Sequence, residues 1–173
     1  MLYYNNMSGA MTSPFLHKGH DHSTCIQTAL DAADVVCQSH KARLTPIRRR
    51  VLELVWQGHS PLGAYELLKT LKTEGHNSAP PTIYRALEFL IQQGLVHRIA
   101  SLNAYVGCNR PGEHHDGTFL ICHVCGTAAE IPDNPMWGPI SEMAQAGNFR
   151  LSHVNVEAVG ECADCQRATG QES

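Results

Sequence analysis

Apolar residues recur every three or four positions through the first half of the chain, which is the spacing of amphipathic helices. Ser, Thr or Pro stands near the start of each such stretch, and Gly closes three of them. The pattern predicts four helices, over about residues 23–40, 45–57, 61–74 and 82–93. The buried face of the fourth helix is predicted to consist of Ile83, Leu87, Leu90 and Ile91.

The spacing changes after Gly94, where two short strands are predicted over residues 95–100 and 104–107. The three residues that join them include Asn103, and a turn-forming Asn at this place indicates a hairpin. Several short helices followed by a two-stranded hairpin are typical of a winged helix–turn–helix domain. In that arrangement the fourth helix enters the major groove of DNA and the hairpin forms the wing.

A second set of elements follows the turn signal at Pro111 and Gly112. Alternating residues predict strands over residues 118–122 and 127–131. A helix is then predicted from about residues 133–135 to residue 146, and a last strand over residues 149–159. Residues 1–22 are rich in Ser, Gly, Asn and His without any period, which predicts a disordered tail.

Four of the seven cysteines form two CxxC pairs, Cys122 with Cys125 and Cys162 with Cys165. Each pair brings two thiolates close enough to hold one metal ion, and four thiolates form the closed tetrahedral set typical of structural zinc. Gly126 permits the tight turn that such a metal knuckle needs. The alternative interpretation is a pair of redox-active dithiols or disulfides.

The composition favours reduced cysteines and a polyanion as partner. No apolar run approaches the roughly 18 residues that span a bilayer, and the N-terminus lacks the apolar core of a secretory signal. We therefore expect a cytoplasmic protein, in which metal binding is favoured over disulfides.

Residues 23–110 carry ten Lys and Arg against six Asp and Glu, whereas residues 111–173 carry two against nine. A basic half followed by an acidic half favours a polyanion-binding domain joined to a second unit.

Candidate DNA contacts lie on three of the predicted helices. The basic residues in and before the second helix, which are candidates for contacting phosphate, are Lys41, Arg43, Arg48, Arg49 and Arg50. On the fourth helix, Thr82, Tyr84 and Arg85 lie outside the apolar stripe. Arg85 is a candidate for pairing with guanine in the major groove, and Thr82 and Tyr84 for holding phosphate. Tyr65 is a further candidate contact, and each of these residues is alternatively an ordinary surface residue.

A second set of metal-binding residue types extends across the linker. His97 lies in the first hairpin strand, Cys108 follows the second, His114 or His115 lies in the linker, and Glu130 lies in a later strand. His97 with one of the two linker histidines, Cys108 and Glu130 would supply two nitrogens, one sulfur and one oxygen, a tetrahedral donor set that suits zinc. A metal bound there would fix the orientation of the two domains, as an allosteric switch requires. The alternative is that these are surface and packing residues.

Several longer motifs are specific to one family. They are residues 43–48 (RLTPIR), 80–87 (PPTIYRAL), 94–98 (GLVHR), 105–108 (YVGC), 119–126 (FLICHVCG), His115, residues 153–157 (HVNVE) and 160–165 (GECADC). With these motifs, about residues 23–166 resemble the ferric uptake regulator family, and within it the zinc uptake regulator branch. The thiol of Cys108 is what distinguishes this chain from iron and peroxide sensors, which favour harder ligands.

The resemblance implies an α+β fold with an N-terminal winged helix–turn–helix domain and a small C-terminal α/β dimerisation domain that carries a structural four-cysteine zinc site. The domain boundaries expected from it are a tail over residues 1–22, a DNA-binding domain over 23–108, a hinge over 109–117, a dimerisation domain over 118–166 and a tail over 167–173. It also implies that the chain is not an enzyme but a bacterial repressor that acts as a homodimer on palindromic operator DNA.

The resemblance further implies two zinc ions per protomer. The structural ion is held by Cys122, Cys125, Cys162 and Cys165, and the regulatory ion by His97, Cys108, His115 and Glu130. His153 with His114 or Asp116 is a candidate third metal site, as some relatives have. The resemblance implies that Tyr65 and Arg85 read the DNA, and neither a membrane nor a small-molecule substrate is expected.

Three other functions compete with zinc-dependent repression. One is a regulator on the same fold that senses iron, manganese or nickel, and another is a thiol or peroxide redox switch. The third is a zinc hydrolase or deaminase, which would need an open metal position and a nearby general base. The chain has neither HExxH nor HxE followed by PCxxC, so the sequence disfavours this third function.

Overall fold

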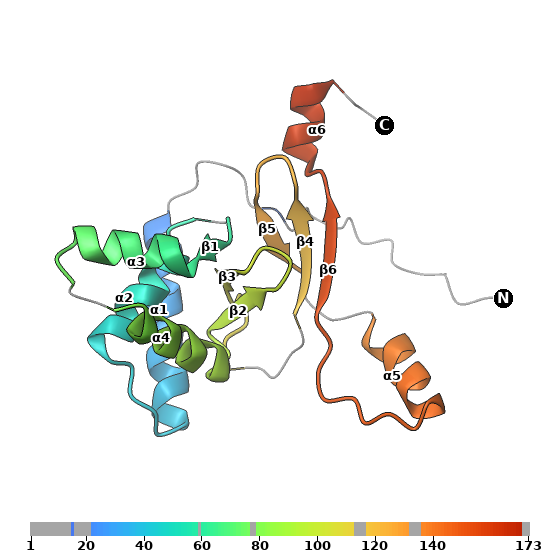
Figure 1. Ribbon diagram of the computed structural model, residues 1–173, viewed down its shortest axis with the longest axis horizontal. Coiled ribbons are helices and arrows are strands. Elements are labelled where there is room, and N and C mark those ends of the chain that lie inside the picture. The colour runs from blue at the N-terminus through green and yellow to red at the C-terminus, as the bar shows by residue number, and fades with distance from the viewer. Residues whose placement is uncertain are drawn as a thin grey trace.

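The first half of the chain forms four helices followed by a small sheet (Figure 1). The computed structural model describes residues 15, 22–58, 60–76, 79–112, 117–131 and 136–170. The helices are α1 (His22–Ser39), α2 (Pro46–Val55), α3 (Ala64–Thr73) and α4 (Pro80–Gln92). The strands are β1 (Leu62–Gly63), β2 (Val96–Ile99) and β3 (Ala104–Gly107), in the sheet order β1-β3-β2. The predicted helices and hairpin are confirmed.

Helix boundaries follow the local signals of the sequence. Pro46 and Pro80 stand in the first turns of α2 and α4, where a proline lacks only an N–H that has no helical partner. Gly94 ends α4 with a positive φ of 66°, and the N–H of Leu95 donates to the carbonyl of Leu90 at 2.9 Å. These contacts form a Schellman motif, which turns the chain directly into β2.

The predicted start of the third helix is wrong by three residues. Leu62 and Gly63 instead form β1, which pairs with Tyr105 and Ala104 of β3. Their backbone groups are therefore hydrogen-bonded within the sheet, and the helix begins only at Ala64. At its start the N–H of Gly63 donates to the side chain of Glu66 at 2.9 Å. The sequence around Ser60 and Pro61 carries no signal of this long-range pairing.

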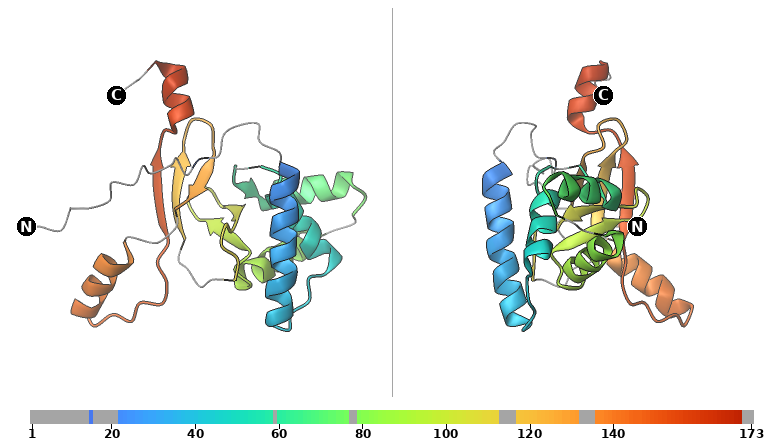
Figure 2. Two further views of the ribbon diagram at one scale, coloured as in Figure 1. Left: turned by 180° about the vertical axis from the view of Figure 1, so that it is seen from behind. Right: turned by 60° about the vertical axis from the view of Figure 1, so that its left-hand side comes forward.

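The second half forms a sheet and two further helices. Strands β4 (Thr118–Cys122), β5 (Ala128–Glu130) and β6 (Val156–Gly160) lie in the order β5-β4-β6, with β5 antiparallel and β6 parallel to β4. The predicted last strand over residues 149–159 is too long, because β4 offers β6 only five residues to pair with. Helix α5 (Trp137–Ala146) stands away from the sheet in Figures 1 and 2.

Helix α6 (Ala163–Thr169) was not predicted. It begins directly after Cys162 and ends at Gly170, whose φ of 72° is the left-handed conformation of a helix end. The expected boundary between the second domain and the tail, at residue 166, lies inside this helix. Among the described residues, no helix has the length and apolar character that crossing a bilayer requires.

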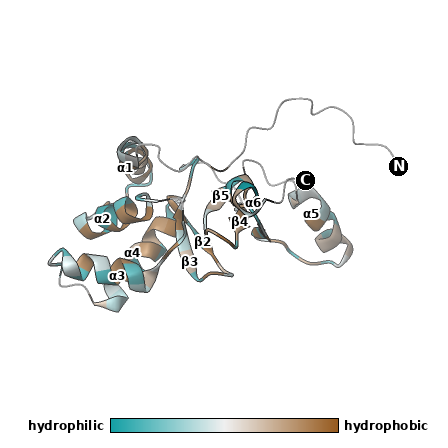
Figure 3. Ribbon diagram, turned by 90° about the horizontal axis from the view of Figure 1, so that it is seen from above, coloured by the Kyte–Doolittle hydropathy of each residue, from teal (hydrophilic) through white to brown (hydrophobic). Residues whose placement is uncertain are grey.

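The core of the first half is built from one face of each helix. In Figure 3 helices α1 to α4 lie on one side and the second sheet on the other, and hydrophobic and hydrophilic positions alternate along α2, α3 and α4. Of the predicted face of α4, Ile83, Leu87 and Leu90 are buried, but Ile91 is 39% exposed and Ala86 is buried in its place. Burying such side chains is the main contribution to the stability of a domain of this size.

A second apolar cluster joins the two halves. Ile99 of β2 is buried against Phe119 and Ile121 of β4, with Val106 and Ala128 beside them. The first sheet and the second sheet are therefore in direct contact through the β2–β3 hairpin. This contact determines how the residues on both sides of the linker face one another.

Candidate metal centres and DNA-facing surface

The four cysteines of the CxxC pairs meet at one end of the second sheet. Cys122 ends β4, Cys125 follows the turn after it, Cys162 precedes α6 and Cys165 lies in its first turn. Their sulfur atoms all lie within 4.8 Å of one another. The turn at Gly126 has the positive φ that the sequence predicts, 73°, and its N–H donates to the carbonyl of Cys122 at 2.9 Å.

The sulfur spacing fits a metal rather than disulfides. The sulfurs of Cys125 and Cys162 are 3.8 Å apart, and none of the seven cysteines, each a described residue, forms a disulfide. Four Zn–S bonds of about 2.3 Å in a tetrahedron place sulfurs about 3.8 Å from one another, whereas a disulfide requires about 2.05 Å. The geometry therefore favours the structural zinc interpretation over disulfides.

The thiols of this cluster differ in acidity. Burial acts to raise the pKa of Cys122, but hydrogen bonds from the backbone N–H groups of Cys125, Cys162 and Val124 lower it to about 6. Burial and hydrogen bonds that the Cys165 thiol makes to the other three sulfurs raise its pKa to about 12. The hydrogen bond with Thr127 also lowers the pKa of Cys125. The first CxxC pair thus holds negative charge readily, whereas ionising Cys165 as well requires a cation, which a divalent metal ion would supply.

A second ligand cluster lies between the two halves. It consists of His97 of β2, Cys108 directly after β3, and Glu130 of β5, whose ligand atoms all lie within 4.8 Å of one another. His97 Nε2 is 3.1 Å from Glu130 Oε1, and Cys108 is only 1% exposed. Three of the four predicted regulatory ligands are therefore together. The fourth, His115, lies outside the described residues, as do His114 and Asp116.

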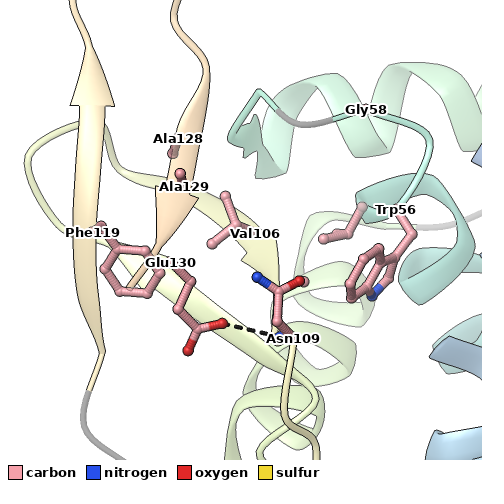
Figure 4. Close-up of a pocket in the computed structure, with 10 residues that line it drawn as sticks. Trp56, Gly58, Val106, Asn109, Phe119, Ala128, Ala129 and Glu130 are labelled. Atoms are coloured by element: carbon pink, nitrogen blue, oxygen red, sulfur yellow. Dashed lines mark hydrogen bonds between the residues drawn. The ribbon is translucent and has the colours of Figure 1, made fainter. Parts of the chain in front are cut away.

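Two neighbouring residues, which the sequence alone does not single out, orient this cluster. The backbone N–H of Asn109 donates to Glu130 Oε2 at 3.0 Å (Figure 4). The other carboxylate oxygen, Oε1, is left to face His97. The ring of Phe119 meets the imidazole of His97 edge-on, with the ring centres 5.3 Å apart. Such contacts fix the orientation of metal-binding side chains before a metal arrives.

A cleft of about 50 Å³ adjoins the cluster, lined by Trp56, Gly107, Asn109, Phe119 and Glu130 among others (Figure 4). The indole of Trp56 lies directly against Gly107, because a Cβ at that position would be 2.2 Å from Trp56 Cε2. A side chain at residue 107 would therefore clash with the indole, and either the ring or the backbone next to Cys108 would have to move.

Replacing Gly107 by alanine is accordingly expected to lower the free energy of unfolding by about 1–3 kcal/mol, the range of overpacking a filled site. Chemical denaturation followed by circular dichroism measures it. Gly58→Ala, in the same cleft, is the matched control, because the nearest atom to its added Cβ is 4.0 Å away. Equal stability of the two variants would mean that the indole moves aside freely.

The candidate DNA contacts on α3 and α4 are exposed. Tyr65 is 78% and Tyr84 53% exposed, which is unusual for aromatic side chains, and Thr82 and Arg85 are exposed beside them. Arg43 is exposed as well. These residues are available to a partner along the sides of α3 and α4 that the core does not use.

The arginines of α2 have partners within the first half. Arg48 donates to the carbonyl of Arg43 at 2.6 Å and its guanidinium lies 3.5 Å from the centre of the Phe89 ring. Arg49 pairs with Asp34, and Arg50 with Glu53 and Glu74. The basic cluster of the sequence is thus partly neutralised in the fold, and Arg49 and Arg50 hold α2 against α1 and the end of α3.

His153, the described member of the candidate third site, is exposed and lies 3.2 Å from the hydroxyl of Ser152. Its expected partners, His114 and Asp116, lie outside the described residues, so the third site stays a prediction.

Comparisons with known proteins agree on one family. The ferric uptake regulator family matches residues 39–159. The zinc uptake regulation protein of Escherichia coli (strain K12) is 36% identical over 143 residues, which cover 82% of this chain and 84% of that protein. A solved zinc uptake regulator in complex with zinc and DNA superimposes with a TM-score of 0.80 at 35% identity, over 84% of this chain and 97% of that one. The holo form of XcZur superimposes with a TM-score of 0.74 at 36% identity, over 85% and 99%.

Proposed function

The chain belongs to the ferric uptake regulator family, and from this premise we propose that it is a zinc-sensing transcriptional repressor, whose zinc-loaded homodimer binds a palindromic operator and represses zinc-uptake genes. The observation that carries this proposal is the His97, Cys108 and Glu130 cluster at the contact between the two halves. Its thiol makes the donor set softer than the oxygen and nitrogen ligands that iron or manganese prefer.

The regulatory zinc would be held by His97, Cys108, Glu130 and, from the linker, His115. Two of these ligands belong to the first half and Glu130 to the second, so one ion would tie the hairpin to the second sheet. Zinc would then stabilise one orientation of the DNA-binding domain over others, which is the requirement for allosteric control. The second zinc, held by Cys122, Cys125, Cys162 and Cys165, would stabilise the C-terminal domain itself.

Both proposed sets supply four protein ligands. A catalytic zinc site keeps one position open for water or substrate, and these sets would not. The proposal is therefore a regulator without catalytic activity, acting on the chromosome in the bacterial cytoplasm. His153 with His114 or Asp116 is retained as a candidate third zinc site.

The homodimer is supported by apolar surface on the second half. Of the described residues of α5, none is buried, although its sequence includes Trp137 and Met143. Met143 is 74% exposed, and Phe149, which follows the helix, is 66% exposed. Exposed apolar groups of this kind mark interfaces in stable proteins. We propose that a second copy of the chain covers them.

For DNA, we propose that α4 enters the major groove. Arg85 would pair with a guanine, Tyr65 would contact a base or the backbone, and Thr82 and Tyr84 would hold phosphates. Arg43 and Arg48 would contact phosphates, with the guanidinium of Arg48 oriented by Phe89. A palindromic site would follow from the two-fold symmetry of the dimer.

The test is fluorescence anisotropy of a labelled operator duplex, titrated with protein at a series of buffered free-zinc concentrations. The expected result is a steep rise of affinity with zinc that iron, manganese and nickel do not reproduce, and its loss in Arg85→Ala with zinc content unchanged. Affinity that does not change with zinc would contradict the proposal. Loss of binding on mild oxidation by peroxide at saturating zinc would instead indicate a redox switch.

A further inference from the structure

The turn of the hairpin is held by a carboxylate from the other half of the chain. The backbone N–H of Ala100 donates to Glu157 Oε1 at 2.6 Å, and that of Ser101 donates to Glu157 Oε2 at 3.0 Å. Ala100 and Ser101 follow β2, whereas Glu157 lies in β6, 56 or more residues away. Figure 1 shows the hairpin lying between the helices and the second sheet.

Strand register places Glu157 in line with the metal cluster. Phe119 of β4 pairs with Glu130 of β5 on one side and with Glu157 of β6 on the other. Residues paired across neighbouring strands lie on the same face of a sheet. Glu130, Phe119 and Glu157 therefore form one row across all three strands, and this row faces the hairpin.

Each member of the row contacts a different part of the hairpin. Glu130 meets His97 and the N–H of Asn109, Phe119 packs against Ile99 and His97, and Glu157 holds the turn. The contact between the halves thus has a metal-ligating end, an apolar middle and a hydrogen-bonded end. Only the first of these would depend on zinc.

The bonds at the Glu157 end are charge-assisted. Burial acts to raise the pKa of Glu157, but hydrogen bonds from Ser101 and from the N–H of Ala100 lower it below its usual value. The carboxylate is therefore ionised at neutral pH, and N–H donors to an ionised carboxylate form bonds roughly twice as strong as neutral ones.

We propose that Glu157 is a zinc-independent latch, which holds the hairpin turn on the second sheet and so lowers the zinc concentration at which the protein becomes competent to bind DNA. The second part rests on the proposed function. A latch that favours the closed orientation raises the fraction of protein competent to bind zinc tightly, and apparent affinity scales with that fraction. Glu157 acts through the orientation of the hairpin and is thus a positioning residue rather than a ligand.

The latch itself is tested by amide hydrogen exchange of the full-length, zinc-loaded protein. In Glu157→Gln, the amides of Ala100 and Ser101 are expected to exchange at least about tenfold faster, because the charged acceptor is gone. Glu157→Asp keeps the charge but is one methylene shorter, and it is expected to lose the same protection. Asp31→Asn, which neutralises an exposed carboxylate on α1, is the control and should leave both amides unchanged. Unchanged exchange in Glu157→Gln would overturn the latch.

The regulatory role is tested by zinc titration of operator binding with the same three variants. Glu157→Gln is expected to raise the free zinc needed for half-maximal binding by about tenfold, the effect of roughly one charge-assisted hydrogen bond, with full affinity recovered at saturating zinc. An unchanged midpoint would overturn this role. Wild-type binding that does not depend on zinc would overturn the proposed function instead, while the exchange measurement would still report on the latch.

Discussion

Replacing Cys122 by serine is expected to release the structural zinc and unfold the C-terminal domain, with loss of the dimer and of operator binding. The sulfur of Cys122 is buried, accepts the N–H of Cys162 at 3.4 Å, and is the most readily ionised thiol of the cluster. A serine hydroxyl stays protonated and is a poor zinc ligand. Because structural zinc contributes on the order of 10 kcal/mol to small metal-binding domains, the expected loss exceeds the stability of most domains.

Three measurements check this prediction: zinc content by mass spectrometry, oligomeric state by light scattering, and secondary structure by circular dichroism. We expect zinc content to fall by one ion per protomer. Cys25→Ser is the matched control, since Cys25 is a half-buried thiol of α1 outside both clusters. If the four cysteines were redox-active dithiols instead, zinc content would be the same in Cys122→Ser as in the wild type.

The parts of the fold that the sequence predicts are those with local signals. Pro46, Pro80 and Gly94 mark helix ends because proline and glycine restrict or extend the backbone at their own positions. The CxxC spacing likewise brings Cys122 and Cys125 together within a single turn. Such features need no knowledge of what the rest of the chain does, so they are read from the sequence correctly.

The parts that sequence analysis misses depend on distant partners. β1 exists because Leu62 and Gly63 pair with β3, and β6 is short because β4 is short. The charge of Arg49 is visible in the sequence, but its pairing with Asp34 of α1 is not. Glu157 looks like an ordinary strand residue until the register of β6 places it opposite the hairpin turn. In each case the information lies in tertiary contacts, which one sequence does not reveal.

The regulatory cluster is an intermediate case. Residue type and the family resemblance suggested His97, Cys108 and Glu130, and the fold brings all three within ligand distance of one another. The contacts that orient them, from Asn109 and Phe119, required the structure. A donor set can therefore be proposed from chemistry alone, whereas its rigidity, which governs how strongly a metal controls the domains, cannot.

Replacing Cys108 by serine should therefore separate sensing from folding. The variant is expected to keep the structural zinc and the dimer but to need at least about a hundredfold more free zinc for operator binding. Loss even of a residue that supports a metal ligand typically costs 10–100-fold in affinity, and here the thiolate ligand itself is removed. Cys108 is 1% exposed and supplies the single thiol among the described members of this cluster.

The measurements are zinc content after dialysis against a weak chelator and operator affinity across buffered zinc. Cys37→Ser is the matched control, because it removes a thiol that is 3% exposed in the core of the first half without touching either ligand cluster. That control should lose stability but keep the zinc midpoint. If Cys108→Ser bound the operator with an unchanged zinc response, the cluster would be a packing feature and zinc control would have to come from another site. A shifted midpoint with an intact dimer would instead identify Cys108 as the residue through which zinc couples the hairpin to the second sheet.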